Sequence, residues 1–134
     1  MHNFTVYHHK KMNIGLIGPS RSGKTRFVYQ ALNQQPLTNA YNPTIVVEVH
    51  PLTLYTYKGE YNTTLYDFGS KYHYDYIDEY YKKTKVALFF PGNNEGENEQ
   101  IVKRYQSVCP SNKVINVTTT SQPLMSALRY MTNK

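Results

Sequence analysis

A glycine-rich loop near the start of the chain constrains the fold more than any other feature. It reads Gly18-Pro19-Ser20-Arg21-Ser22-Gly23-Lys24-Thr25, a complete G-x-x-x-x-G-K-[ST] pattern. The apolar run Ile14–Ile17 precedes it and the helical pattern Arg26–Asn33 follows it, which is the strand–loop–helix context that the motif requires. Glycines let backbone N–H groups turn inward around a phosphate, and the helix N-terminus adds a favourable field. We therefore expect nucleoside triphosphate binding, with an ordinary glycine-rich turn as the alternative.

The side chains of this loop have separate expected roles. Lys24 should reach the β- and γ-phosphates as an exposed side chain rather than a core residue, which also makes it a candidate catalytic residue. The Thr25 hydroxyl should ligate Mg²⁺. The expected nucleotide-binding residues of the loop are Gly18, Ser20, Arg21, Ser22, Gly23, Lys24 and Thr25.

Length and composition narrow the class of protein. The 134 residues suit one domain over 1–134, and no apolar run approaches the roughly 20 residues that span a bilayer. Cys109 is the only cysteine, so no internal disulfide can form, and its place on an apolar helical stripe predicts a core residue. The net charge is +6, but the basic residues are scattered, which favours a solvated surface over a nucleic-acid partner. We expect a reducing, cytoplasmic setting without a signal peptide.

Hydrophobic periodicity and turn residues divide the chain into strands and helices. The segment 58–60 separates two β-rich runs and predicts a hairpin, and Pro51, which cannot donate to a β-ladder, places the first run at a sheet edge. The order predicts an α/β P-loop NTPase fold: a mostly parallel five-stranded sheet with one antiparallel edge strand and helices on both faces. The expected strands are 12–18, 44–57, 61–67, 86–90 and 113–117, and the expected helices are 24–33, 72–83, 97–109 and 123–131.

Two further motifs, together with the phosphate loop, carry a family resemblance. Tyr41-Asn42-Pro43-Thr44-Ile45 resembles the first switch of the Ras/Rab-like small GTPases, and Thr44 lies 20 positions after Lys24, a spacing that suits the family. Tyr66-Asp67-Phe68-Gly69-Ser70 resembles the second switch motif, D-x-x-G, at the end of a strand. Without the family, Thr44 also fits an ordinary strand-initiating residue, and Asp67 fits a turn or helix-cap residue.

The resemblance implies a protein that binds GTP and GDP with Mg²⁺. Thr25, Thr44 and Asp67 would hold the metal ion, because hydroxyl and carboxylate oxygens are suitable hard ligands. ATP remains open as a second nucleotide.

The resemblance also implies protein partners. They would contact the first switch through Tyr41, Thr44 and Ile45, and the expected helix over Tyr72–Tyr81. Tyrosines crowd that helix, and several rings should be exposed because a helix buries only one stripe. Surface tyrosines that reflect a biased composition are the alternative.

The second switch departs from the family pattern at two positions. Ser70 replaces the glycine whose backbone N–H meets the γ-phosphate in the family, and a side chain there restricts the approach. Lys71 occupies the place of the usual water-orienting glutamine, and a protonated lysine donates hydrogen bonds but cannot accept them. Lys71 is therefore a candidate catalytic residue with a changed role, and we expect slow or absent hydrolysis.

The base-reading motif of the family, N-K-x-D, is absent. The run Thr118-Thr119-Thr120-Ser121 stands in its place, and Thr118 is the candidate base contact. Without the carboxylate that reads guanine, we expect only about tenfold discrimination between GTP and ATP. The segment 119–122 also fits a remnant of the family's second base-contacting loop, left after deletion of an earlier element, and the two readings stay open. We expect no lipid anchor, since the prenylation and myristoylation patterns are absent.

These features predict a shortened, divergent Ras-like switch or host-interaction module, and its size and composition fit a gene of a large DNA virus. A small P-loop kinase is one alternative, although no lid-sized insertion rich in arginine is visible. A protein that retains the fold as a decoy without binding nucleotide is another. Phosphate release without an acceptor, phosphate transfer, or no binding at all would separate the three.

Overall fold

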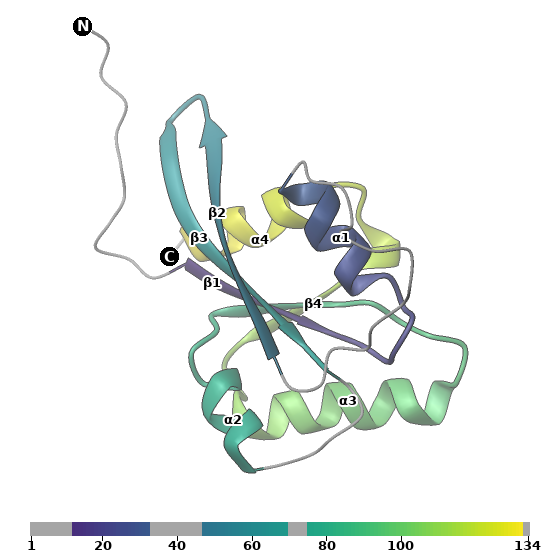
Figure 1. Ribbon diagram of the computed structural model, residues 1–134. Coiled ribbons are helices and arrows are strands. Elements are labelled where there is room, and N and C mark those ends of the chain that lie inside the picture. The colour runs from purple at the N-terminus through teal and green to yellow at the C-terminus, as the bar shows by residue number, and fades with distance from the viewer. Residues whose placement is uncertain (1–11, 33–46, 70–74, 133–134) are drawn as a thin grey trace, which may run out of the picture.

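The structure, a computed structural model, describes residues 12–32, 47–69 and 75–132. Strands and helices follow one another in the expected order (Figure 1). The strands are β1 (Met12–Ile17), β2 (Val47–Thr56), β3 (Gly59–Phe68), β4 (Val86–Phe89) and β5 (Lys113–Asn116). The helices are α1 (Lys24–Ala31), α2 (Asp75–Tyr81), α3 (Glu95–Val108) and α4 (Pro123–Thr132), and a short 3₁₀ turn, η1 (Val117–Thr119), follows β5.

The five strands form one sheet in the order β2-β3-β1-β4-β5. β1 pairs in parallel with β3 and β4, β4 pairs in parallel with β5, and β2 runs antiparallel to β3. Pro51 lies on β2, opposite Thr64 of β3. β2 is at the edge of the sheet, so no further strand needs the N–H that proline lacks. The α/β fold predicted from the sequence, including its antiparallel edge, is confirmed.

Helices cover both faces of the sheet, and the two faces have different cores. α1 and α4 lie on one face and α2 and α3 on the other (Figure 1). Side chains alternate along each strand, so Leu16 points to α1 and α4 while Ile17 points to α2 and α3. The core under α1 and α4 is mainly aliphatic; its buried members are Ile14, Leu16, Val28, Leu65, Val86, Leu88, Phe90, Ile115 and Ala127.

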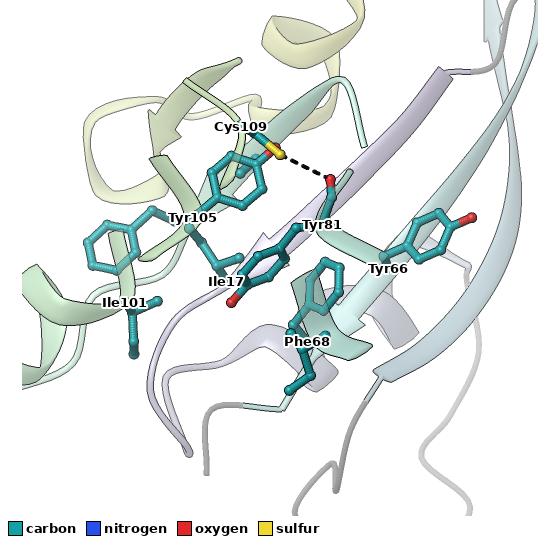
Figure 2. Close-up of a cluster of buried hydrophobic side chains, with 10 residues drawn as sticks. Ile17, Tyr66, Phe68, Tyr81, Ile101, Tyr105 and Cys109 are labelled. Atoms are coloured by element: carbon teal, nitrogen blue, oxygen red, sulfur yellow. Dashed lines mark hydrogen bonds between the residues drawn. The ribbon is translucent and has the colours of Figure 1, made fainter. Parts of the chain in front are cut away.

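The core under α2 and α3 is mainly aromatic. Phe68 and Tyr81 pack edge to face with ring centroids 4.7 Å apart, and Tyr81 packs on Tyr105 in the same way at 5.2 Å (Figure 2). The Cys109 thiol donates to the Tyr81 carbonyl oxygen over 3.3 Å, so the predicted core position of this cysteine is confirmed. Burial raises the pKa of the Tyr81 hydroxyl to about 12.

Some helix ends differ from those expected. α3 begins two residues early, at Glu95, because the Asn94 side chain accepts a hydrogen bond from the Glu97 backbone N–H at 3.0 Å and caps the helix. α2 ends at Tyr81 rather than residue 83, because the Thr84 backbone N–H and hydroxyl both donate to the Tyr81 carbonyl oxygen. Within the described ranges, no helix is both long and apolar enough to cross a membrane.

Candidate functional site

The phosphate loop joins the end of β1 to the start of α1, and its backbone needs glycine at two points. A Cβ on Gly18 would collide with the Phe90 carbonyl oxygen, so only glycine lets the loop lie this close to the end of β4. Gly23 has a φ of 101°, in the left-handed region that favours glycine. Arg21 adopts a φ of 64°, which is uncommon outside glycine and is found at turns and functional sites.

Lys24 is buried, and the expectation of an exposed side chain is wrong. Only 6% of the residue is exposed, because the side chain folds under the loop and its ammonium donates to the carbonyl oxygens of Gly18 at 2.7 Å and Pro19 at 2.9 Å. Burial lowers the pKa of Lys24, while the charges of Asp67 and Glu97 oppose that shift. The loop therefore holds a partly desolvated cation against two of its own backbone carbonyl oxygens.

Thr25 and Asp67, two of the three expected metal ligands, lie together. The Thr25 hydroxyl donates to Asp67 Oδ2 at 3.0 Å, which joins the first turn of α1 to the end of β3. Asp67 is fully buried, and its other carboxylate oxygen, Oδ1, has no hydrogen-bond partner among the residues that the structure describes. Burial raises the pKa of Asp67, while the Lys24 charge and the Thr25 hydrogen bond lower it.

The remaining loop residues divide into exposed and buried groups. Ser20 and Arg21 are exposed at the tip of the loop. The Ser22 hydroxyl is buried and finds no hydrogen-bond partner within 12–32, 47–69 and 75–132. Buried polar atoms without partners are rare in folded proteins, so Ser22 Oγ and Asp67 Oδ1 mark a place where a polar ligand would complete the hydrogen bonding.

The oxygen ligands present fit magnesium better than a metal held in an all-protein cage. Within 12–32, 47–69 and 75–132, no group of three His, Cys, Asp or Glu side chains could hold a metal ion. Mg²⁺ usually takes one or two protein oxygens and completes its shell with water and phosphate oxygens. The Thr25 hydroxyl and the unpartnered oxygen of Asp67 match that pattern.

Asn116, which no sequence motif singled out, lies at the end of β5, two positions before the expected base contact Thr118. Its side-chain oxygen accepts hydrogen bonds from the Thr118 backbone N–H at 3.0 Å and from the Thr118 hydroxyl at 2.7 Å. Thr118 is exposed, but its hydroxyl proton is used by Asn116. An Asn two positions before a Thr, near the end of the expected strand 113–117, was the available signal for this turn. A cavity of about 350 Å³ opens beside Asn116, between α3 and the ends of β4 and β5.

Several expected site residues lie outside the described residues: Tyr41, Thr44, Ile45, Ser70 and Lys71, together with Tyr72 and Tyr74 of the tyrosine-rich segment. Within α2, Tyr81 is buried in the aromatic core and Tyr80 is partly buried against Tyr66. The physical reason is that consecutive tyrosines at the end of this short helix both lean on the sheet. The side chain of Tyr76 also lies outside the described residues, so the exposure of several rings in this segment stays a prediction.

Comparison with protein families gives a match over residues 13–122 to Roc, the Ras-of-Complex domain described from DAP kinase. The chain belongs to the Roc family. Roc is a Ras-like GTPase domain, so this protein is a Ras-like GTP-binding domain, and its phosphate loop, sheet order and helices agree with that family. A search of the curated proteins found no match to the chain.

Proposed function

We propose that this Roc-family domain binds GTP and GDP together with Mg²⁺ and hydrolyses GTP slowly, as a nucleotide-dependent switch. One observation carries the proposal. The phosphate loop and the end of β3 bring together a buried lysine and two buried oxygen atoms that have no hydrogen-bond partner among the described residues, Ser22 Oγ and Asp67 Oδ1. A phosphate group with its metal ion supplies the opposite charges and the missing contacts.

Lys24 would act as the phosphate-binding cation. Its ammonium is tied to the carbonyl oxygens of Gly18 and Pro19, which keeps it under the loop with a third N–H free to donate. A phosphate oxygen would accept from this N–H and would raise the pKa of Lys24, which burial lowers. Phosphate binding would therefore offset the free-energy cost of desolvating the lysine.

Thr25 and Asp67 would hold Mg²⁺, directly or through water. Bound Mg²⁺ would neutralise charge on the β- and γ-phosphate oxygens. Burial raises the pKa of Asp67, and a cation beside the carboxylate would oppose that shift by favouring the ionised form. The Thr25 hydroxyl, now donating to Asp67, would keep its oxygen lone pairs for the metal.

Base choice would be weak for a member of this family. The Thr118 hydroxyl donates to the Asn116 side-chain oxygen. Neither residue has the carboxylate that reads the two N–H groups of guanine. We propose that GTP is preferred over ATP by only about tenfold. A preference of 10³-fold or more would mean that other groups read the base.

Hydrolysis would be slow because water positioning is weak. Lys71 and Ser70 stand at the second-switch positions, and lysine cannot accept a hydrogen bond from the attacking water. Single-turnover assays with γ-labelled GTP should give a rate on the order of 10⁻⁴ s⁻¹ or less, and Lys71→Gln should raise it. Fast hydrolysis abolished by Lys71→Ala would instead make Lys71 a catalytic residue.

Calorimetry of GTP binding with Mg²⁺ tests the proposal. Lys24→Met should weaken binding by about 100-fold, the loss expected for a hydrogen bond between charged groups. Lys85→Met makes the same substitution at an exposed lysine and is the matched control; this variant should bind GTP as tightly as the wild type does. Because Lys24 is buried and desolvated, Lys24→Met should unfold in urea at an equal or higher concentration. Equal affinity of wild type and Lys24→Met would rule out the phosphate-loop site.

A further inference from the structure

The first turns of α3 carry a polar side chain where an apolar one would be expected. Asn98 occupies the inward-facing stripe with Ile101 and Tyr105 and is only 6% exposed. Its amide makes two hydrogen bonds with a single residue: Oδ1 accepts from the Gly92 backbone N–H at 2.9 Å, and Nδ2 donates to the Gly92 carbonyl oxygen at 3.0 Å. Asn98 therefore clamps the segment between β4 and α3 by its backbone.

The clamped segment lies directly against the phosphate loop. A Cβ on Gly92 would come within 2.5 Å of Pro19 Cγ, so the Gly92 backbone packs on the Pro19 ring with no room for a side chain. Two residues earlier, the Phe90 carbonyl oxygen occupies the space beside Gly18 in the same way. The segment 90–92 thus forms one wall of the first half of the loop.

The same half of the loop holds the phosphate-binding lysine. The carbonyl oxygens of Gly18 and Pro19 both accept from the Lys24 ammonium. A continuous set of contacts therefore runs from Asn98 to the Gly92 backbone, from Gly92 to the Pro19 ring, and from the Pro19 carbonyl to Lys24. A shift of Gly92 would change the position of one of the two acceptors that orient the ammonium.

We propose that Asn98 is a positioning residue for the phosphate loop: by clamping Gly92 against Pro19, it fixes the carbonyl groups that aim Lys24. The proposal rests on the proposed nucleotide binding for its functional consequence. Asparagine suits the role because its amide donates and accepts at once; aspartate would lack the donor and leucine would lack both. In this role Asn98 acts on nucleotide binding through Gly92 and Pro19.

Asn112 provides a matched control for Asn98. Asn112 is a partly buried amide in the loop after α3. Like Asn98 it makes two hydrogen bonds, here to the Thr84 carbonyl oxygen and to the Tyr105 hydroxyl, both at 2.9 Å and away from the phosphate loop. Asn98→Ala should weaken GDP binding in the presence of Mg²⁺ by about tenfold, the loss expected from two neutral hydrogen bonds. Asn112→Ala should lower stability in urea by a similar amount without changing the affinity.

Glycine substitutions test the same contact without removing a hydrogen bond. Gly92→Ala forces Pro19 to move and should also weaken GDP binding. Gly96→Ala, inside the first turn of α3, has its nearest contact at 3.4 Å, to the Asn94 side-chain oxygen, and should leave binding unchanged. These two variants keep the proposal testable if Asn98→Ala fails to fold.

Hydrogen exchange separates failure of this proposal from failure of the proposed function. Without added nucleotide, Asn98→Ala and Gly92→Ala should speed exchange of the backbone amides in 18–23, whereas Asn112→Ala should not. If the wild type binds no GDP, the proposed function fails, and the exchange data alone decide the role of Asn98. The proposal is overturned if Asn98→Ala changes neither exchange nor affinity, or if Asn112→Ala changes both as much.

Discussion

Two groups of buried polar atoms lie at opposite ends of the parallel strands, and they differ in how completely they are hydrogen bonded. The first group, at the N-terminal ends of β4 and β5, consists of Thr84, Tyr105 and Asn112. The Thr84 hydroxyl donates to the Tyr81 carbonyl oxygen at 2.7 Å, the Tyr105 hydroxyl can then donate to Thr84 at 2.6 Å, and Asn112 donates to Tyr105. The Thr84 and Tyr105 hydroxyls therefore each donate one hydrogen bond and accept another.

The second group, at the C-terminal ends of the parallel strands, is the phosphate loop with Asp67. Here a buried ammonium is bonded to carbonyl oxygens, a buried carboxylate has one oxygen without a partner, and the Ser22 hydroxyl has none. Burial lowers the pKa of Lys24 and raises the pKa of Asp67, and each shift favours the neutral form of the group. These atoms are as enclosed as the first group but are poorly satisfied.

The difference separates groups that hold the fold together from groups arranged for a ligand. A fully bonded buried network stabilises one structure, and removing a member leaves its neighbours unsatisfied. Unsatisfied buried groups lower stability unless a ligand completes them. Substitutions in the two groups should therefore change stability in opposite directions.

Removal of the Tyr105 hydroxyl should have the largest effect on stability. Tyr105→Phe leaves Asn112 without one acceptor and Thr84 without one donor, and should lower the free energy of unfolding by about 1–3 kcal/mol. Urea unfolding measures the loss, and Tyr55→Phe, at a ring that is 71% exposed, is the control. Nucleotide affinity should not change. A Tyr105→Phe protein as stable as the wild type would remove the distinction between the two groups.

Neutralisation of Asp67 should act in the opposite direction and depend on pH. Because burial raises the pKa of Asp67, the folded protein holds this proton more tightly than the unfolded chain does. The penalty for the ionised carboxylate is absent well below the ordinary carboxyl pKa and complete once the pH exceeds the raised value. Asp67→Asn should therefore stabilise the fold by about 1 kcal/mol at high pH and by little at low pH.

Urea unfolding at several pH values tests this, with Glu99→Gln at an exposed carboxylate as the control. The same Asp67→Asn variant should lose most of the Mg²⁺ dependence of nucleotide binding. Destabilisation by Asp67→Asn at every pH would show that the carboxylate is structural rather than reserved for a ligand.

The smallest effect is expected at a polar contact that solvent reaches. Arg104 on α3 donates from Nε and Nη2 to the Asp78 carboxylate on α2, over 3.1–3.2 Å, with both side chains about a third exposed or less. Arg104→Met should lower stability by only about 0.5 kcal/mol, and the loss should shrink in high salt. A double-mutant cycle with Asp78→Asn measures the pair. A coupling as large as the Tyr105→Phe effect would mean that the pair belongs with the buried network.

The sequence by itself determined the order of elements and the place of the phosphate loop. Pro51 predicted the sheet edge, the motif Gly18–Thr25 predicted the turn between β1 and α1, and both were right because a missing N–H and a glycine backbone act locally. The association of Thr25 with Asp67 was also predictable, since family resemblance places both at one edge of the sheet. The roles of these residues stay predictions.

Only the tertiary structure decided which of these groups are buried and what they touch. The burial of Lys24 depends on the path of its own loop against β4, and the clamp of Asn98 on Gly92 depends on how α3 packs beside that loop. Tyr81 and Tyr105 entered one core because two helices cover the same face of the sheet. Local sequence patterns describe what a residue can do. Contacts between segments far apart in the chain, which no periodicity encodes, decide which partners it meets.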